Sequence, residues 1–161
     1  MALIAVIDDD PDILDASSLV LKTNGFEVIT AQNPDDGYKI IKENKPDLII
    51  LDWEMPGLNG IETTRKLKDD PSTQEIPVII CTGKMTSSSH LETALAAGAV
   101  DYIRKPLDKI ELLARLQSML LLSDSYKRIK NLNENKNKLL SIIAHDLKNP
   151  LYTVKLLMDY L

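Results

Sequence analysis

Short apolar runs and amphipathic stretches alternate five times along the N-terminal part of the chain. The runs are four to six residues long and mostly rich in aliphatic side chains, which is typical of strands buried on both faces of a parallel sheet. The predicted strands are 3–7, 26–31, 48–51, 77–81 and 101–104, and the predicted helices are 11–24, 33–44, 59–69, 87–97 and one that begins near 108. Five strand–helix units with short connections predict an α/β fold built on a doubly wound, five-stranded parallel sheet.

The helical pattern that begins near residue 108 has no evident end. No glycine or proline occurs between Asp108 and Asn149, and apolar residues recur at intervals of three and four or at sums of seven. These positions form a heptad seam: 122, 126, 129, 140, 143, 147, 154, 157 and 161. Polar Asn133 and Lys136 interrupt the seam. We expect a long C-terminal coiled-coil helix, either continuous or jointed near residue 123, that forms a homodimer because a lone apolar stripe needs a partner.

Charge is divided unevenly between the two parts of the chain. Of the 161 residues, 1–122 hold 20 acidic and 12 basic side chains, and 123–161 hold 4 and 7. A net negative domain binds DNA poorly, and an aromatic content of 4% disfavours stacking on single strands, so we expect no nucleic-acid partner. The single cysteine, Cys81, fits a reducing compartment, and no apolar stretch is long enough to span a membrane. We therefore expect a cytoplasmic protein with no membrane segment in this chain.

Polar side chains with related chemistry stand at the ends of four predicted strands. Asp8 and Asp9 follow the first strand, Asp52 the third, Thr82 the fourth and Lys105 the fifth. The carboxyl ends of parallel strands share one edge of the sheet, where ligands bind, so we expect these side chains to lie together. Three carboxylates, a hydroxyl and an ammonium are suited to bind a divalent cation and a phosphoryl group, so the sequence predicts such a site.

The residue types allow specific roles to be predicted. Asp8, Asp9 and Asp52 suit Mg²⁺ or Mn²⁺, since hard cations take oxygen ligands. The Asp52 carboxylate could attack phosphorus and form an aspartyl-phosphate. Lys105 and the Thr82 hydroxyl could then contact two oxygens of the transferred group and neutralise its charge.

Together these residues resemble the receiver domain of two-component response regulators over residues 1 to about 122. The motifs that carry the resemblance are Asp8-Asp9, Asp52 with Met55-Pro56 and Gly60, Thr82-Gly83, and Lys105-Pro106. The resemblance implies a flavodoxin-like sheet with strand order 2-1-3-4-5 and Asp52 as the phosphoacceptor. It implies metal ligation by Asp8, Asp9, Asp52 and the backbone carbonyl of Glu54. It also implies phosphoryl contacts from Thr82 and Lys105, and a switch pair formed by Thr82 and Tyr102.

A second candidate site lies far downstream, around His145. A lone helical histidine is usually a surface residue, but imidazole accepts phosphoryl groups, and the adjacent Asp146 could hold its tautomer or accept its proton. Residues 141–151 resemble the phosphoacceptor box of histidine kinases, on the first helix of their dimerisation and phosphotransfer domain. This resemblance implies that His145 is phosphorylated, that Asp146 is its acid/base partner and that Asn149 aids phosphotransfer or phosphatase chemistry.

Our hypothesis is a hybrid histidine kinase of which this chain is the N-terminal part. It divides into a receiver (1–122), a coiled-coil linker (123–140) and a truncated histidine phosphotransfer helix (141–161). The Gly-rich ATP-binding motifs of kinases do not occur, so we expect no autophosphorylation by the chain itself. Expected partners are phosphodonor or phosphoacceptor signalling proteins. A stand-alone response regulator that acts by dimerisation or docking is the alternative. A hydrolase of the haloacid dehalogenase type is disfavoured, because the segment 8–12 lacks the Thr or Val that such an enzyme needs.

Overall fold

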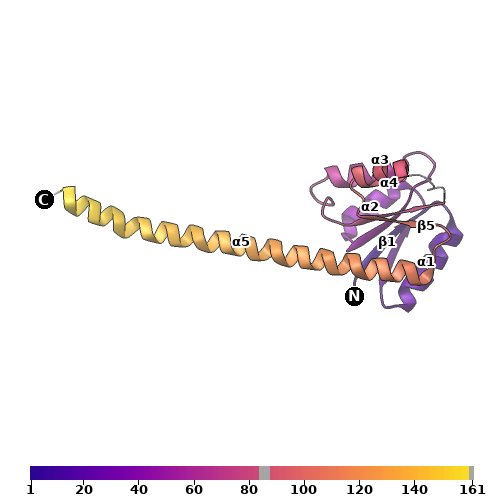
Figure 1. Cartoon of the computed structure of the whole chain (residues 1–161), viewed down its shortest axis with the longest axis horizontal. Coiled ribbons are helices and arrows are strands. Elements are labelled where there is room, and N and C mark those ends of the chain that lie inside the picture. Colours follow the sequence, from indigo (N-terminus) through magenta and orange to yellow (C-terminus); the bar gives the residue numbers. More distant parts are fainter. Residues whose placement is uncertain (84–87, 160–161) are drawn as a thin grey trace. The chain divides into compact units, whose positions relative to one another are not determined.

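A computed structural model describes the backbone of residues 1–83 and 88–159 and the side chains of residues 1–83 and 89–146. The chain divides into two compact units, Met1–Leu120 and Leu121–Leu161. The first unit contains a five-stranded parallel sheet in the order β2-β1-β3-β4-β5 (Figure 1). This order and the α/β architecture confirm the prediction.

The elements alternate strictly along the chain, as the apolar pattern predicts. They are β1 (Leu3–Ile7), α1 (Pro11–Thr23), β2 (Glu27–Ala31), α2 (Pro34–Asn44), β3 (Leu48–Asp52), α3 (Gly60–Asp69), β4 (Val78–Thr82), α4 (Ser88–Ala96), β5 (Asp101–Arg104) and α5 (Lys109–Asp159). Each observed boundary lies within about two residues of the predicted one, the usual scatter at element ends. Two of these small shifts matter, because they place Asp52 and Thr82 inside β3 and β4 rather than after them.

The sheet is covered on both faces, which explains why its central strands are apolar throughout. One core layer joins the sheet to α2, α3 and α4 through Ile41, Leu67 and Ala94. The other joins it to α1 and the first turns of α5 through Leu21 and Leu116. Figure 1 shows these two groups of helices on opposite sides of the strands. Every residue of β3 and β4 is buried, so the polar residues at their ends are held by two apolar layers.

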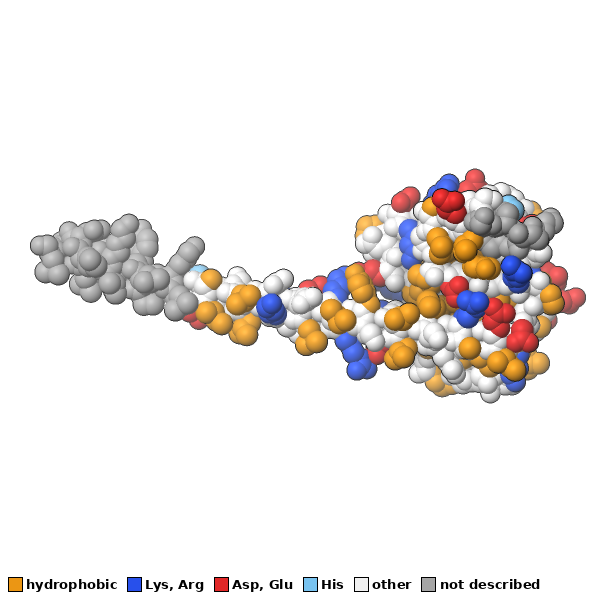
Figure 2. Space-filling view, in the orientation of Figure 1, with side chains coloured by type: hydrophobic (Ala, Val, Ile, Leu, Met, Phe, Trp, Pro, Cys, Tyr) orange, Lys and Arg blue, Asp and Glu red, His pale blue; other side chains and the backbone are white. Residues whose placement is uncertain are grey.

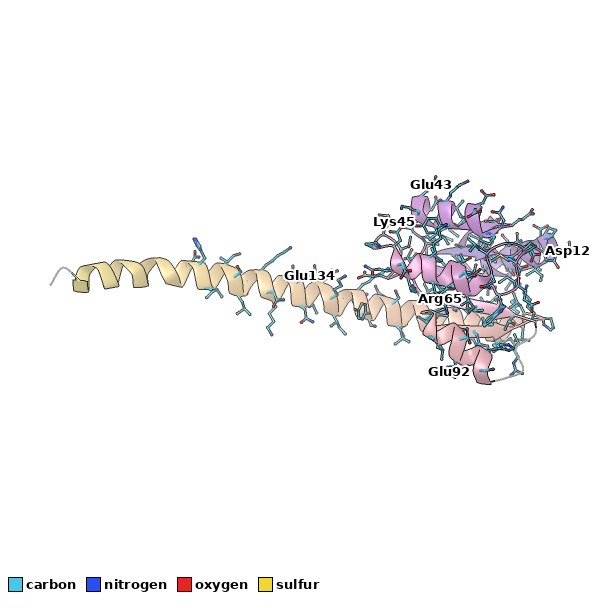
Figure 3. All side chains as sticks on the ribbon, turned by 90° about the horizontal axis from the view of Figure 1, so that it is seen from above. Asp12, Glu43, Lys45, Arg65, Glu92 and Glu134 are labelled. Carbon is cyan, nitrogen blue, oxygen red and sulfur yellow. The ribbon has the colours of Figure 1, made fainter. Side chains whose placement is uncertain are left out.

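Local signals in the sequence set the helix ends. The Asp10 side chain accepts a hydrogen bond from the Asp12 backbone N–H at the start of α1. A capping box opens α3, in which Asn59 accepts from the Glu62 N–H and Glu62 accepts from the Asn59 N–H. The C-cap residue of α2, Lys45, is labelled in Figure 3. It adopts a left-handed conformation with φ of 48°. The two N-caps fix where α1 and α3 begin beside the carboxyl edge, and Lys45 marks where α2 ends.

The second unit is helical from Leu121 to Asp159, in agreement with the predicted long C-terminal helix. Its described side chains project outward, as Glu134 does in Figure 3. The exposed residues include large apolar side chains of the predicted seam: Leu122, Tyr126, Ile129, Leu140 and Ile143. Figure 2 shows hydrophobic side chains along the described part of this helix. Across the described ranges, no helix has both the length and the apolar character needed to cross a membrane.

Candidate functional site

The acidic residues of the site lie side by side because their strands are neighbours. Ile7 and Leu51 are paired in the β1–β3 ladder, so the residues that follow them, Asp8 and Asp52, occupy adjacent positions at the carboxyl edge. Both side chains are almost fully buried, whereas Asp9 is exposed. Carboxylate oxygens of the three residues lie within 4.8 Å of one another. The predicted acidic cluster is therefore present, with one carboxylate open to solvent.

Lys105 connects the two buried carboxylates. Its Nζ lies 2.6 Å from Asp8 Oδ2 and 2.8 Å from Asp52 Oδ1, and only 18% of its side chain is exposed. The backbone positions it, since the Lys105 N–H donates to the carbonyl of Thr82, the last residue of β4. The ammonium, carried by the residue after β5, therefore lies between carboxylates that come from the ends of β1 and β3.

Burial and charge shift the ionisation of this cluster in defined directions. Burial raises the pKa of Asp52, and Asp8 raises it further, while the hydrogen bond from Lys105 opposes both. Burial alone would lower the pKa of Lys105, but its hydrogen bonds to Asp52 and Asp8 outweigh that effect and raise it. The lysine therefore stays charged and supports a carboxylate that its surroundings would otherwise tend to protonate.

Gly60 allows the loop after β3 to pack closely against the end of β3 itself. A Cβ atom at Gly60 would clash with the backbone carbonyl oxygen of Asp52. The Gly60 N–H donates to the Trp53 carbonyl at 2.9 Å, and the Trp53 N–H donates to the Cys81 carbonyl at 2.8 Å. Gly60 is thus required by close backbone approach, a physical reason that the motif alone does not reveal.

The remaining predicted residues of this site occupy the same region of the sheet. Thr82 is buried at the end of β4, where it pairs with Arg104. Tyr102 is half-buried on β5 and packs against the core layer of α2, α3 and α4. Glu54 is exposed two residues after Asp52, in the loop between β3 and α3.

The sequence gives no indication of a ring contact that the structure shows beside Asp52. Trp53 and His90 form a T-shaped ring pair with centroids 5.8 Å apart and planes at 65°. His90 is exposed, and its contact connects Trp53, the residue after Asp52, to α4. No local signal predicts this pair, because the two residues belong to segments that only the fold brings together.

The histidine of the second candidate site lies on the second unit, in α5. The side chains of His145 and Asp146 are 75% and 71% exposed, and His145 Nδ1 lies 3.4 Å from Asp146 Oδ1. A long contact between neighbouring exposed groups leaves the imidazole accessible. The predicted partner Asn149 lies outside the residues whose side chains are described.

Comparison with known proteins decides the family. Residues 4–117 match the response regulator receiver domain. The chain belongs to this family. Receiver domains act in two-component signalling by accepting a phosphoryl group on an aspartate, and they bind Mg²⁺ at an acidic pocket such as the one formed by Asp8, Asp9 and Asp52. The oxygen-only donor set of this receiver domain fits such a hard cation.

Several receiver proteins are similar to this chain in sequence. It is 40% identical over 117 residues to the phosphate regulon transcriptional regulatory protein PhoB of Pseudomonas aeruginosa, a match that covers 73% of this chain and 51% of PhoB. It is 38% identical over 120 residues to protein PilH of the same organism, covering 74% of this chain and 98% of PilH. The chain thus spans about half the length of PhoB and nearly all of PilH.

Solved structures of receivers superimpose well on the chain. A CheY-like receiver domain protein from Methanospirillum hungatei has a TM-score of 0.73 at 28% identity, and the match covers 78% of this chain and 98% of that one. The signal receiver domain of a signal transduction histidine kinase from Syntrophus aciditrophicus has a TM-score of 0.68 at 27% identity, covering 74% of this chain and 90% of that one. Both regulator-type and kinase-type proteins therefore contain receivers similar to this one.

Proposed function

We propose that Asp52 is the phosphoacceptor of this receiver domain and that phosphorylation at Asp52 depends on Mg²⁺ or Mn²⁺. The observation that carries the proposal is the position of Lys105 Nζ, 2.8 Å from an Asp52 oxygen at the carboxyl edge of the sheet. An oxygen of Asp52 attacks phosphorus of the donor, an O–P bond forms, and the bond to the donor's leaving group breaks. Negative charge develops on the phosphoryl oxygens beside the lysine.

The other residues of the site stabilise this transfer. Lys105 pairs with one phosphoryl oxygen, and the Thr82 hydroxyl donates a hydrogen bond to another. Asp8, Asp9, Asp52 and the carbonyl of Glu54 hold the divalent cation, which supplies further charge neutralisation when bound. Reorientation of Thr82 toward the phosphoryl group vacates space near β5 that Tyr102 fills, which gives the receiver two conformations.

The finer proposal concerns the output of the receiver. We place the chain in a hybrid histidine kinase, in which Asp52 regulates a dimeric helix that carries His145 as a second phosphoacceptor. Its support is the accessible His145 imidazole beside Asp146, together with similarity to a receiver that belongs to a histidine kinase. Asp146 accepts or returns the imidazole proton, and Asn149 assists transfer or hydrolysis. The cytoplasm is the proposed location.

The apolar side chains exposed on the second unit support dimerisation through α5. Tyr126 and Ile129 are more than half exposed and lie three residues apart on the seam. Replacing both by alanine is expected to abolish any change in dimerisation on phosphorylation, as measured by analytical ultracentrifugation with and without acetyl phosphate. An exposed pair off the seam, Lys127 and Lys130, changed to glutamine serves as the control. An unaltered response in the Tyr126/Ile129 variant would contradict the proposal.

A stand-alone regulator remains the second candidate, favoured by the similarity to PilH, which is little longer than the matched region. In that case the His145→Ala variant is expected to be phosphorylated at Asp52 to the same extent as the wild-type chain and to signal normally. In the hybrid kinase, the same change in the complete protein is expected to abolish phosphorylation by ATP. That the chain has no nucleic-acid partner also stays a prediction. PhoB is a transcriptional regulator, and the match to it covers about half of its length.

Intact-mass spectrometry tests the proposed acceptor directly. The wild-type chain, incubated with Mg²⁺ and acetyl phosphate, is expected to gain one phosphoryl group, and addition of a chelator is expected to prevent the gain. Asp52→Asn is expected to gain none, because the amide is a poor nucleophile. The control variant is Asp15→Asn, an exposed aspartate on α1. An adduct that persists in Asp52→Asn, or that needs no divalent cation, would overturn the assignment.

A further inference from the structure

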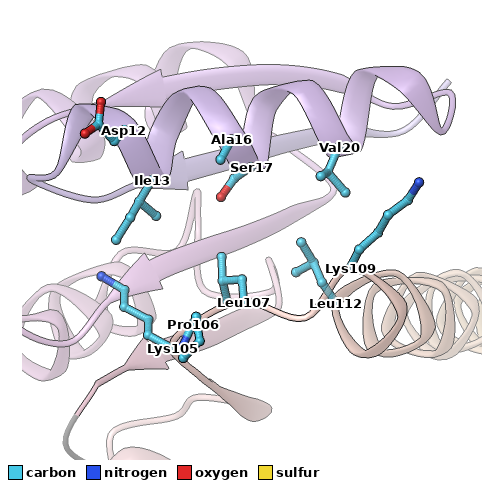
Figure 4. Close-up of a pocket in the computed structure, with 10 residues that line it drawn as sticks. All are labelled: Asp12, Ile13, Ala16, Ser17, Val20, Lys105, Pro106, Leu107, Lys109 and Leu112. Carbon is cyan, nitrogen blue, oxygen red and sulfur yellow. The ribbon is translucent and has the colours of Figure 1, made fainter.

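A largely apolar pocket of about 570 Å³ lies between α1 and the segment that joins β5 to α5. Its walls include Ile13 and Val20 on one side and Leu107 and Leu112 on the other (Figure 4). All of these residues belong to the first unit. The volume and the predominance of aliphatic side chains are typical of sites for small organic ligands.

One polar atom inside this pocket lacks a partner. Ser17 is 3% exposed, and its Oγ is the one buried side-chain nitrogen or oxygen, among the residues that the structure describes, without a hydrogen bond. Figure 4 shows the hydroxyl pointing from α1 into the space above Leu107. An unpaired buried hydroxyl costs free energy that a ligand oxygen would recover. The pocket therefore presents a fixed hydrogen-bonding position in otherwise apolar surroundings.

Charged groups stand at the edges of the pocket. Lys109 lines it from the start of α5 and is exposed, and in Figure 4 its ammonium lies near Val20. Asp12 lies at the other end, where its carboxylate points away from the cavity. Lys105 also contributes to the wall, but its charge is directed to Asp8 and Asp52. Among the described residues that line the pocket, Lys109 is therefore the cationic group available to an occupant.

We propose that this pocket binds a small amphipathic monoanion, a molecule with an aliphatic or aromatic body and a single carboxylate. The body lies against Ile13, Val20, Leu107 and Leu112, an oxygen atom meets Ser17 Oγ, and the carboxylate pairs with Lys109. An apolar segment of a partner protein could fill the same walls, but its apolar side chains would leave the buried Ser17 hydroxyl unpaired. The proposal concerns binding alone and does not depend on phosphorylation of Asp52.

Methyl NMR of the full chain, titrated with 5-hydroxydecanoate below its micelle concentration, tests the site, because this probe carries both a carboxylate for Lys109 and a hydroxyl for Ser17. Saturable shifts are expected at the methyls of Ile13, Val20 and Leu107. Ala16→Leu fills the pocket from an exposed position on α1, so it is expected to weaken binding at least about tenfold without unfolding the domain. Ser17→Ala and Lys109→Gln are each expected to weaken it about fivefold, the usual effect of one lost polar contact.

Two controls separate the proposed site from non-specific binding. Lys39→Gln, an exposed lysine on α2, is expected to leave the affinity unchanged. Decyltrimethylammonium has a similar body but a positive charge, and it is expected to bind at least about tenfold more weakly because Lys109 repels it. Equal affinity for the cation, shifts that persist in folded Ala16→Leu, or shifts only at exposed α5 methyls such as those of Leu139 would overturn the proposal. Absence of any saturable shift would do the same.

Discussion

Removal of the ammonium between Asp8 and Asp52 is expected to destabilise the receiver in a pH-dependent way. Lys105→Met keeps the aliphatic stem but leaves two carboxylates, each about 3% exposed, without their shared cation. Breaking a buried ion pair by deleting one partner costs about 3–5 kcal/mol. Because 18% of the lysine side chain reaches solvent, we expect the lower end, about 3 kcal/mol at neutral pH.

The direction of the pH dependence follows from Asp52. Its pKa is raised in the folded protein by burial, against the opposing hydrogen bond from Lys105, so loss of that bond raises it further. A group whose pKa is raised by folding favours the folded state below its unfolded value, and this contribution disappears as pH rises through the folded value. The stability difference between wild type and Lys105→Met is therefore full at neutral pH and shrinks as pH falls and Asp52 becomes protonated.

Urea unfolding monitored by Trp53 fluorescence measures this difference, since the only tryptophan follows Asp52 directly. The double variant Lys105→Met/Asp52→Asn is expected to recover part of the lost stability, because it removes one of the unpaired charges. Partial recovery is expected, since Asp8 stays buried. A loss below about 1 kcal/mol, or a loss that is the same in neutral and mildly acidic solution, would refute the reasoning that Lys105 holds the two carboxylates.

Three further changes test other parts of the structure. Gly60→Ala introduces a Cβ that clashes with the Asp52 carbonyl, so about 1–3 kcal/mol of overpacking cost and slower phosphorylation are expected in urea unfolding and mass assays. Tyr38→Phe removes the 2.6 Å hydrogen bond that contributes most to lowering the pKa of the Asp70 carboxyl, so NMR titration is expected to show that pKa rising. Asn59→Ala removes the capping box of α3 and is expected to cost about 1 kcal/mol in urea unfolding; no loss would mean that the cap is dispensable.

The fold could be predicted from the sequence because each element carries its own signal. Apolar runs identify strands buried on both faces, and caps such as Asn59 mark helix starts. The strand ends could not be fixed to the residue, because the ladder extends as far as pairing with a neighbour allows. Asp52 pairs with Cys81 and so belongs to β3, although its side chain alone suggests a loop.

The site could be predicted in composition and place but not in its contacts. Parallel topology puts Asp8, Asp52 and Lys105 at one edge, so their proximity follows from strand order alone. The contacts of Lys105 with both carboxylates could not be predicted, because they depend on backbone positions that β4 and β5 set together. The Trp53–His90 pair and the buried Ser17 hydroxyl depend on packing between distant segments, for which a single sequence holds no signal.

The charge balance of the site explains why a divalent cation and phosphorylation would support each other. Asp8, Asp9 and Asp52 carry three negative charges against one positive charge on Lys105, a net charge that one divalent cation cancels. Phosphorylation of Asp52 replaces one negative charge by about two. The phosphorylated site would then hold the cation more tightly, and linkage requires the cation to favour the phosphorylated state by the same factor. Equal Mn²⁺ affinities for the two states, measured by paramagnetic broadening with a phosphoryl mimic such as beryllofluoride, would contradict this account of the site.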